Sequence, residues 1–202
     1  FHPFREIDVL KDPSKPPTEA NTRRLGVASV RDALVQKILY TDVLYEPAEA
    51  LFRELDLRGP VSYAYRRGKS TATAALRIHS YIADGYTFVY DADLSKFFDS
   101  IPHDPLLKKV CALVGGEDSR TYALVRRFVS ADRTPYASYE KAHLHGRYVG
   151  ERIFCERKPC RERRTAGVVQ GGTLSGLLAN LYLHNFDYWL MSRVAQDIDL
   201  RY

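Results

Sequence analysis

The sequence predicts a mixed α/β fold in which helices surround a strand that carries acidic residues. Residues 86–101 begin with an apolar, strand-like run that contains Asp91 and Asp93. Stretches with helical spacing of apolar residues lie on both sides of this run, and several of them end at glycine. The 202 residues, of which 45% are hydrophobic, are enough to bury a core as one or two domains.

The N-terminal part predicts little regular structure before its first helix. Residues 1–20 contain four prolines among charged side chains, which predicts an extended lead-in rather than a folded element. Residues 23–39 predict a short strand or loop followed by a helix with Ser29 as its N-cap. The buried stripe of that helix is expected to be Leu34, Val35, Ile38 and Leu39. A second short helix is expected to begin at Pro47 and to stop at Gly59.

Residues 61–85 predict an aromatic strand, a basic turn and a helix. Three cations surround a glycine at positions 66–69, and Ser70 is the expected N-cap of a helix that Gly85 ends. Positive charge, a permissive backbone and free amide donors at a helix start suit a phosphate group. A solvated basic turn is the alternative interpretation.

The second half of the chain predicts three more helices and a hairpin. A helix after Asp104 and Pro105 ends at two glycines. The next, at 119–131, has an apolar side formed by Tyr122, Val125, Phe128 and Val129. Residues 136–164 predict a β-hairpin or a long loop. A glycine-rich turn then leads into a long helix with apolar positions at Leu174, Leu177, Leu178, Leu181, Trp189 and Leu190.

The placement of two carboxylates on the same face of the expected strand at 86–101 needs a physical explanation. Alternate strand residues share a face, so Asp91 and Asp93 would point the same way. Buried carboxylates are costly unless they are paired, solvated or bound to a cation. The run therefore predicts either a cation site or a strand end where both side chains meet water.

The basic charge is concentrated in one segment. The formal net charge is +5, and residues 141–164 alone contain eight Lys or Arg against three Glu. Aromatic residues are interleaved with these cations, which suits contacts to a nucleic-acid backbone together with base stacking. A solvated, exposed hairpin is the alternative interpretation. The candidate nucleic-acid-binding residues are Arg147, Arg152, Arg157, Lys158, Arg161, Arg163 and Arg164.

Cysteine usage and hydropathy exclude two classes of protein. Three cysteines without a regular framework indicate a reducing compartment, so we expect a cytoplasmic protein rather than a disulfide-built secreted one. Cys155 and Cys160 lie at C-x4-C spacing, but no second Cys or His pair follows, so no zinc site is expected. No run approaches the roughly 18 apolar residues of a membrane helix, and no membrane partner is expected.

Four stretches, in the same order along the chain, resemble the sequence blocks of reverse transcriptases. They resemble specifically those of group II introns and their bacterial relatives, including CRISPR-associated ones. The stretches are RRLGVASVRDALVQ, SYAYRRGKSTATAAL, DADLSKFFDSIPHDPLL and GVVQGGTLSGLLANLYL. The first, second and fourth resemble RPLGIPTVRDRVVQ, SYGFRPGRSxxxAL and GTPQGGxxSPLLANxYL, and the third resembles polymerase motif A. The family usually has proline where this chain has Arg24, Arg67, Val169 and Gly176. These departures leave the subgroup open.

The resemblance implies a right-hand polymerase with an antiparallel palm sheet and packed helices. Residues 1–85 and 118–163 would be fingers, and residues 86–117 and 164–202 a partial palm. The family completes its site with a Tyr-Ala-Asp-Asp hairpin, and the chain ends DIDLRY, in register with the start of that motif. Because the first residue is Phe1 rather than Met, we expect a piece of a longer bacterial protein that is inactive without its remaining palm and thumb. A naturally truncated or degenerate copy without polymerase activity is the alternative.

The resemblance also implies roles for individual residues. Asp93 takes the place of the metal-binding catalytic carboxylate, with the Leu94 carbonyl as a second oxygen ligand. Phe98 matches the aromatic residue that blocks a ribose 2′-hydroxyl. The residues that match nucleotide-binding positions are Arg23, Arg66, Lys69, Gln170 and Gly171. Asp91 matches no such role, and we expect it not to be a primary ligand.

The implied reaction is RNA-templated DNA synthesis, in which a primer 3′-hydroxyl attacks the α-phosphorus of a dNTP. Two Mg²⁺ ions about 3.5–4 Å apart, with Mn²⁺ as a substitute, would stabilise both ends of the displacement. The implied partners are an RNA template, a DNA or RNA primer and dNTPs, with an intron RNA or a CRISPR adaptation integrase as further candidates. The alternatives are a catalytically incomplete RNA-binding, maturase-like module of the same fold and a phosphate-binding protein of unrelated fold.

Overall fold

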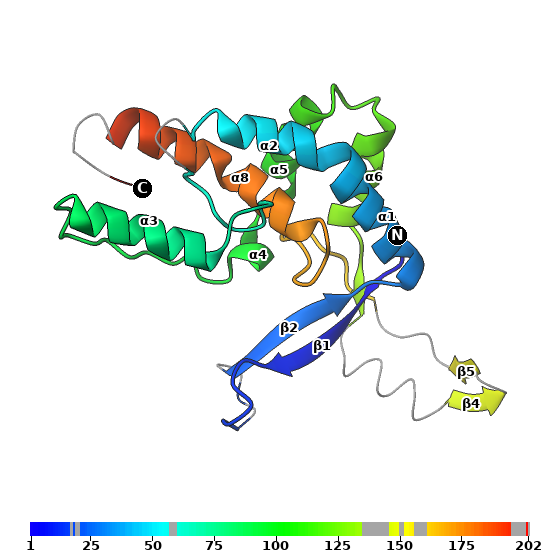
Figure 1. Cartoon of the computed structure of the whole chain (residues 1–202). Helices are drawn as coiled ribbons and strands as arrows, with labels where there is room; N and C mark the ends of the chain where they lie inside the picture. The colour runs from blue at the N-terminus through cyan, green and yellow to red at the C-terminus, as the bar shows by residue number, and fades with distance from the viewer. Residues whose placement is uncertain are drawn as a thin grey trace.

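The chain folds into a layer of packed helices with a small sheet at one end (Figure 1). The computed structural model describes residues 1–16, 18, 21–56, 60–134, 146–149, 152–155, 161–194 and 201. Within them the predicted mixed α/β class is confirmed. No helix of this described part is long and apolar enough to cross a membrane.

The sheet has the strand order β2-β1-β3, and its first strand corrects a prediction. β1 (Phe4–Leu10) pairs antiparallel with β2 (Thr22–Val27) from Arg5 opposite Val27 to Leu10 opposite Thr22, and parallel with β3 (Arg133–Thr134). Residues 1–20 are thus not an unpaired lead-in. The prolines lie outside β1, where they remove no hydrogen bond between paired strands. Within β1, Phe4 and Glu6 are buried and Arg5 between them is exposed.

The first helical run buries only part of the face that the apolar pattern predicts, since Leu39 is buried and Val35 is partly buried. α1 (Val30–Ile38) continues through a π-helical segment (Leu39–Leu44) into α2 (Tyr45–Arg53), and Ser29 caps α1 as predicted. Leu34 and Ile38 are, however, 61% and 55% exposed. Asp32 and Gln36 are buried instead, because they accept hydrogen bonds from the backbones of His2 (2.8 Å) and Thr173 (3.0 Å).

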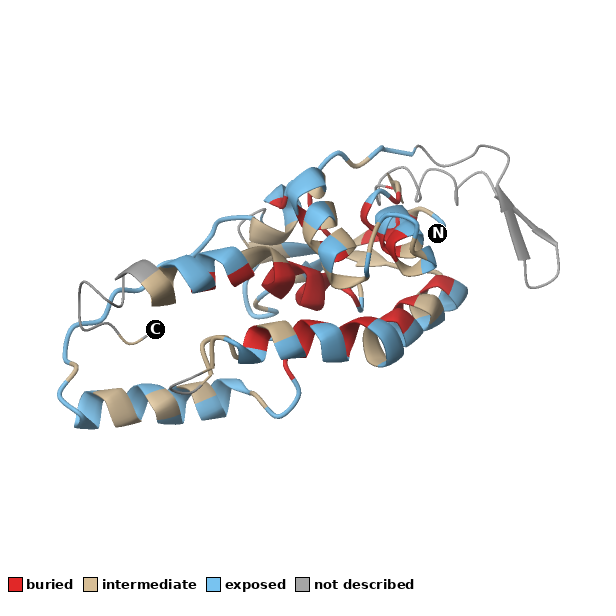
Figure 2. Cartoon of the chain, turned by 90° about the horizontal axis from the view of Figure 1, so that it is seen from above, coloured by how far each residue is buried: buried red, intermediate tan, exposed pale blue. Residues whose placement is uncertain are grey.

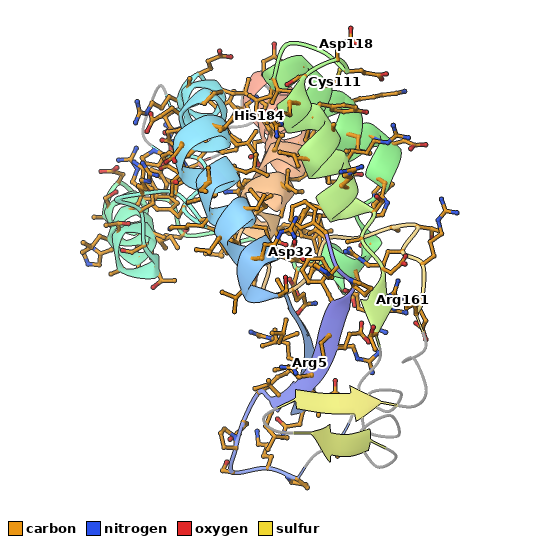
Figure 3. The ribbon with its side chains drawn as sticks, turned by 90° about the vertical axis from the view of Figure 1, so that its right-hand side faces the viewer. Arg5, Asp32, Cys111, Asp118, Arg161 and His184 are labelled. Atoms are coloured by element: carbon orange, nitrogen blue, oxygen red, sulfur yellow. The ribbon has the colours of Figure 1, made fainter. Side chains whose placement is uncertain are left out.

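Buried polar residues lie both next to the sheet and farther along the helical layer. Figure 3 shows Asp32 at the end of α1 next to the sheet and His184 among the helices farther away. His184 lies on α8 (Ser175–Trp189), where its ring centroid is 5.9 Å from that of Phe52 on α2. The contact joins the two helices through buried side chains.

α3 (Thr71–Ala83) forms where predicted but lies at the margin of the molecule. Ser70 and Thr73 form a capping box, and Gly85, with φ of +100°, follows the helix end. No residue of α3 is buried, as Figure 2 shows. The aromatic strand predicted before it is not formed, because residues 61–65 follow bends and turns.

The strand predicted at 86–101 is also not formed. Residues 86–94 are irregular, and Phe88, Val89 and Tyr90 are 100%, 79% and 92% exposed. A strand needs a neighbour to pair its backbone N–H and C=O groups, and no strand in the described part of the chain lies beside this segment. The run ends at Lys96, whose φ of +52° turns the chain into the short helix α4 (Phe97–Ser100).

The remaining elements largely follow the sequence pattern. α5 (His103–Leu113) ends before Gly115 and Gly116, whose φ values are positive, and α6 (Arg120–Val129) buries the four predicted side chains. β4 (Gly146–Val149) pairs with β5 (Arg152–Cys155), which confirms the hairpin. α8 buries its predicted leucines up to Leu181, whereas Trp189 is 50% exposed, and a π-helical segment (Leu190–Val194) follows.

The core is densest around Phe128 of α6. Its ring is fully buried and makes edge-to-face contacts with Phe1 and Phe4, at centroid distances of 5.9 and 5.7 Å. Gly172, at the entry to α8, lies against the same ring, since a Cβ atom added there would be 3.0 Å from Phe128 Cζ. Phe128 therefore connects the sheet, α6 and the turn before α8.

Removing the Phe128 ring is expected to destabilise the protein strongly. Phe128→Ala should lower the free energy of unfolding by about 3–5 kcal/mol, because it deletes packing and leaves a cavity. Phe88→Ala, a matched change at a fully exposed ring, should change it by no more than about 0.5 kcal/mol. Urea unfolding followed by circular dichroism measures both values, and similar losses for the two variants would contradict the proposed core.

Candidate functional site

A cleft of about 940 Å³ brings together most of the residues singled out from the sequence. Its walls come from β1, β2, residues 93–99, Arg133 and residues 163–171. Tyr65, from the basic turn, completes the lining. The predicted site residues that line the cleft are Arg23, Asp93, Leu94, Phe98, Arg163, Arg164, Gln170 and Gly171.

Backbone hydrogen bonds on both sides of residues 167–170 hold the cleft together. The amides of Gly167 and Val168 donate to the carbonyl oxygens of Ile101 (2.6 Å) and Phe98 (2.7 Å). On the other side, the Gly26 amide of β2 donates to the Gln170 carbonyl (2.7 Å). The segment thereby fixes Phe98 on one wall relative to β2 on the other.

Two glycines make this close approach possible. A Cβ atom on Gly26 would lie 2.2 Å from Val169 Cγ1. One on Gly167, which has φ of +81°, would lie 2.6 Å from the Asp99 carbonyl oxygen. A larger residue at either position would push the backbones apart and open the cleft.

Hydrogen bonds to buried polar side chains hold the turn at Gln170 and Gly171 in place. The Ser175 hydroxyl donates to the Val169 carbonyl, and the Thr173 amide donates to Gln36 Oε1 at 3.0 Å. Gly171 has φ of +95°, which suits glycine. The Gln170 side-chain amide extends over the cleft and lies 3.4 Å from Asp99 Oδ2.

Positive charge exceeds negative charge in the cleft lining. Seven Lys or Arg side chains line it against four carboxylates. Glu6 offsets part of this charge, because Arg24 and Arg133 lie 3.8 and 3.4 Å from its carboxylate oxygens. Burial lowers the pKa of Arg164, and repulsion from Arg133 lowers it further. Within the described residues, Arg164 Nη1 is buried and has no hydrogen-bond partner. The surplus suits a polyanion.

The lining also contains oxygen donors of the kind that Mg²⁺ binds. The Asp93 side chain is exposed, and both Asp93 and Leu94 line the cleft. Carboxylate and carbonyl oxygens fit a hard cation that retains part of its water shell. The described residues contain no cluster of three or more His, Cys, Asp or Glu suited to a metal. Asp93 and Leu94 could therefore supply part of a coordination shell.

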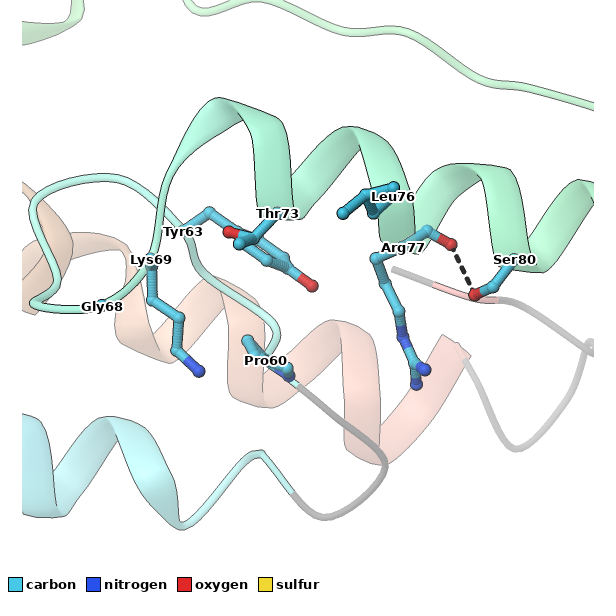
Figure 4. Close-up of a pocket in the computed structure, with 8 residues that line it drawn as sticks. All are labelled: Pro60, Tyr63, Gly68, Lys69, Thr73, Leu76, Arg77 and Ser80. Carbon is cyan, nitrogen blue, oxygen red and sulfur yellow. Dashed lines mark hydrogen bonds between the residues drawn. The ribbon is translucent and has the colours of Figure 1, made fainter.

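Lys69 lies outside the cleft, in a separate groove of about 400 Å³ (Figure 4). The groove runs along α3 and is lined by Tyr63, Lys69 and Arg77 among others. Arg77 Nε donates to the Tyr81 hydroxyl at 2.9 Å. The predicted grouping of Lys69 with Arg23 is thus not formed in this structure.

Arg66 is buried beneath the basic turn. Its side chain is 1% exposed and donates to Glu49 (2.8 Å), to Asp56 (2.6 Å) and to the Ser62 carbonyl (3.0 Å). Burial alone would raise the pKa of Glu49, but the bonds to Arg66 outweigh it and the net shift is downward. These contacts anchor the turn to α2, and a role for Arg66 in binding nucleotide stays a prediction.

Four of the seven predicted nucleic-acid-binding side chains lie outside the described part of the chain. Arg157 and Lys158 lie outside the described residues, as do the side chains of Arg147 and Arg152. Arg161 is exposed and does not line the cleft (Figure 3).

Sequence reasoning missed Tyr65 and Gln36. Tyr65 lines the cleft, and Gln36 supports the turn at Gln170 from a buried position. Gln36 gave a weak signal, because a polar residue lay within the expected apolar stripe of α1. Tyr65 gave none, since its contacts are with residues distant in the chain.

Comparison with known proteins identifies one family. The sequence profile described as "Reverse transcriptase (RNA-dependent DNA polymerase)" matches residues 13–202. The chain is 29% identical over 192 residues to the "Uncharacterized 91 kDa protein in cob intron" of Schizosaccharomyces pombe, covering 94% of this chain and 19% of that protein. It is 26% identical over 191 residues to "Group II intron-encoded protein LtrA" of Lactococcus lactis subsp. cremoris, covering 94% and 25%. It is 27% identical over 183 residues to "Protein YkfC" of Escherichia coli, covering 88% and 40%. The chain thus spans less than half the length of each relative.

The buried cluster around Arg66 makes stability sensitive to Glu49. Glu49→Gln should lower the free energy of unfolding at pH 7 by about 3–5 kcal/mol, because it leaves a buried guanidinium short of charge. The folded-state pKa of Glu49 lies below its ordinary 4.5. Its stabilising contribution is therefore complete above pH 4.5 and is lost as the pH falls through the lowered value.

Glu46→Gln is the matched control, because Glu46 is 70% exposed where it meets Arg67. That change should cost less than about 1 kcal/mol. Denaturant unfolding at several pH values measures both variants, and an equal cost for the two would contradict the role of the cluster.

Proposed function

The chain belongs to the reverse transcriptase family, and from this premise we propose that the protein adds deoxynucleotides to a primer on an RNA template. One observation carries the proposal. Asp93, Leu94 and Phe98 line the same cleft as Gln170 and Gly171, although more than 70 residues separate the two groups in the chain.

In this proposal each wall of the cleft has its own task. Asp93 and the Leu94 carbonyl hold Mg²⁺, which when bound supplies positive charge to the reacting phosphate and to the primer hydroxyl. Arg23 neutralises the triphosphate, and the cations at positions 163 and 164 bind the phosphate backbone of the nucleic acid. They do so in a cleft whose cations outnumber its carboxylates.

The selection of substrate falls to Phe98, on the same stretch of chain as Asp93, and to the turn at Gln170 and Gly171. Phe98 occupies the space that a ribose 2′-hydroxyl would need, so a deoxyribose is accepted. Gln170 and Gly171 face the new base pair, where the glycine allows close approach and the amide can donate. The proposed partners are an RNA template, a DNA or RNA primer and dNTPs. One relative is by name a group II intron-encoded protein, so an intron RNA is a further proposed partner.

A second candidate function is RNA binding without catalysis. The surplus of cations in the cleft supports it as well, because phosphate neutralisation requires no metal. This candidate differs in its outcome: binding would be sensitive to salt and would survive the loss of Asp93.

Replacement of Asp93 tests the proposed reaction. In the full-length protein, Asp93→Ala should lower primer extension on an RNA template to below about one hundredth, because it removes a carboxylate that would hold Mg²⁺ at the reacting phosphate. Asp91→Ala is the matched control on the same segment and should retain extension. Equal extension by wild type and Asp93→Ala would sink the polymerase assignment, and salt-sensitive RNA binding by that variant would then favour the second candidate.

Replacement of Phe98 tests sugar selection. Phe98→Ala should ease the incorporation of ribonucleotides, because the ring no longer excludes a 2′-hydroxyl. The measurement is the ratio of kcat/KM for a dNTP to that for the matching rNTP. Phe88→Ala removes a fully exposed ring outside the cleft and should keep the wild-type ratio. An unchanged ratio in Phe98→Ala would count against its gate role.

A further inference from the structure

Tyr65 is held in a backbone conformation that its residue type disfavours. Its φ is +57°, in the left-handed region, where bulky side chains are rare. Such a conformation costs about 1–3 kcal/mol and persists only when the surrounding structure enforces it. Tyr65 nevertheless remains 55% exposed, and its exposed ring lines the cleft.

Anchors on both sides enforce this conformation. Before it, the Asn180 side-chain amide of α8 donates to the Ala64 carbonyl at 2.6 Å. After it, Arg66 is locked into its buried cluster, and the Arg67 amide donates to the Tyr45 hydroxyl at 2.7 Å. The backbone on either side of Tyr65 is thus fixed to α2 and to α8. This fixed backbone sets the direction of the Tyr65 ring.

The ring of Tyr65 packs between Phe98 and the first turn of α8. Its centroid lies 6.2 Å from that of Phe98, with the planes at 66° in an edge-to-face arrangement. On its other side the ring lies against Gly176, where an added Cβ atom would be 2.3 Å from Tyr65 Cγ. Phe97 contacts Phe98 from a second direction, at 6.0 Å and 83°.

We propose that Tyr65 is a positioning residue for sugar selection, which braces the Phe98 ring against the nucleotide. This inference rests on the proposed function. A ring that excludes a hydroxyl must resist being pushed aside, and a partly exposed phenylalanine cannot do so without packing behind it. Phe98 is only partly buried, so contacts with Tyr65 and Phe97 supply that resistance.

Gly176 is part of the same packing arrangement around the Tyr65 ring. A residue with a Cβ atom at this position would occupy the space of the Tyr65 ring, so glycine is what lets the tyrosine reach Phe98. Gly176 is buried in α8, where alanine is the better helix former. Gly176→Ala therefore displaces the ring from the helix side without weakening α8 through its backbone preference.

The test compares dNTP and rNTP selectivity across a set of variants of the full-length protein. Tyr65→Leu and Gly176→Ala should each lower the ratio of kcat/KM for dATP to that for ATP by about two- to tenfold, the range that corresponds to one lost edge-to-face contact. Tyr65→Phe keeps the ring and should restore the ratio. Tyr188→Leu, at a 59% exposed tyrosine outside the cleft, is the matched control and should keep the wild-type value.

A second measurement does not depend on chemistry. Competition between dATP and ATP for binding to the same variants should show the same ordering. Gly176→Ala also reaches the ring independently if Tyr65→Leu does not fold, as judged by circular dichroism. Wild-type selectivity in Tyr65→Leu and Gly176→Ala, together with its loss in Phe98→Ala, overturns the inference and leaves the proposed function standing. A wild-type protein with no selectivity in either measurement overturns the inference together with the gate role of Phe98.

Discussion

The double-sided hydrogen bonding of residues 167–170 is the constraint on which the cleft depends. One edge of this segment bonds to the backbone at Phe98 and Ile101, and the other bonds to Gly26 in β2. Two chain segments far apart in sequence are thereby brought to one opening. Because backbone groups make these bonds, the arrangement does not depend on which side chains occupy the segment. It does require glycine where the chains touch.

Hydrogen bonds of buried polar groups determine which side of α1 faces the core. These bonds could not be predicted from the sequence. Caps and apolar faces were predictable where local chemistry decides them, as for Ser29, Ser70 and the buried side of α6. The facing of α1 was not, because Asp32 and Gln36 are buried by partners more than 25 residues away. The apolar pattern of α1 predicts that Leu34 and Ile38 are buried, because such a pattern does not register hydrogen-bond partners that are distant in the chain.

The same distinction applies to strands. β1 was missed because its pairing partners lie in β2 and β3, and the prolines around it dominated the local pattern. The strand expected at 86–101 was predicted from its apolar residues, yet propensity alone cannot form a strand without a neighbour. For the site, the resemblance of four blocks identified six residues that line one cleft, and the basic segment added Arg163 and Arg164. It could not show that Arg66 is buried in an ion cluster or that Lys69 lies in a separate groove.

The two walls of the cleft consequently differ in how firmly they are built. The wall with Gln170 rests on backbone bonds, on the side-chain oxygen Oε1 of buried Gln36 and on buried Ser175. The opposing Asp93 lies in an irregular, exposed segment that becomes fixed only where Lys96 turns into α4. In the proposed role as a metal ligand, Asp93 has to be held within a fraction of an ångström, so packed neighbours must supply the support that this irregular segment lacks. The aromatic contacts among Tyr65, Phe97 and Phe98 begin one residue after Lys96. These contacts lie between the end of the acidic segment and the Phe98 ring, so the proposed metal ligand and the proposed sugar gate belong to one packed unit.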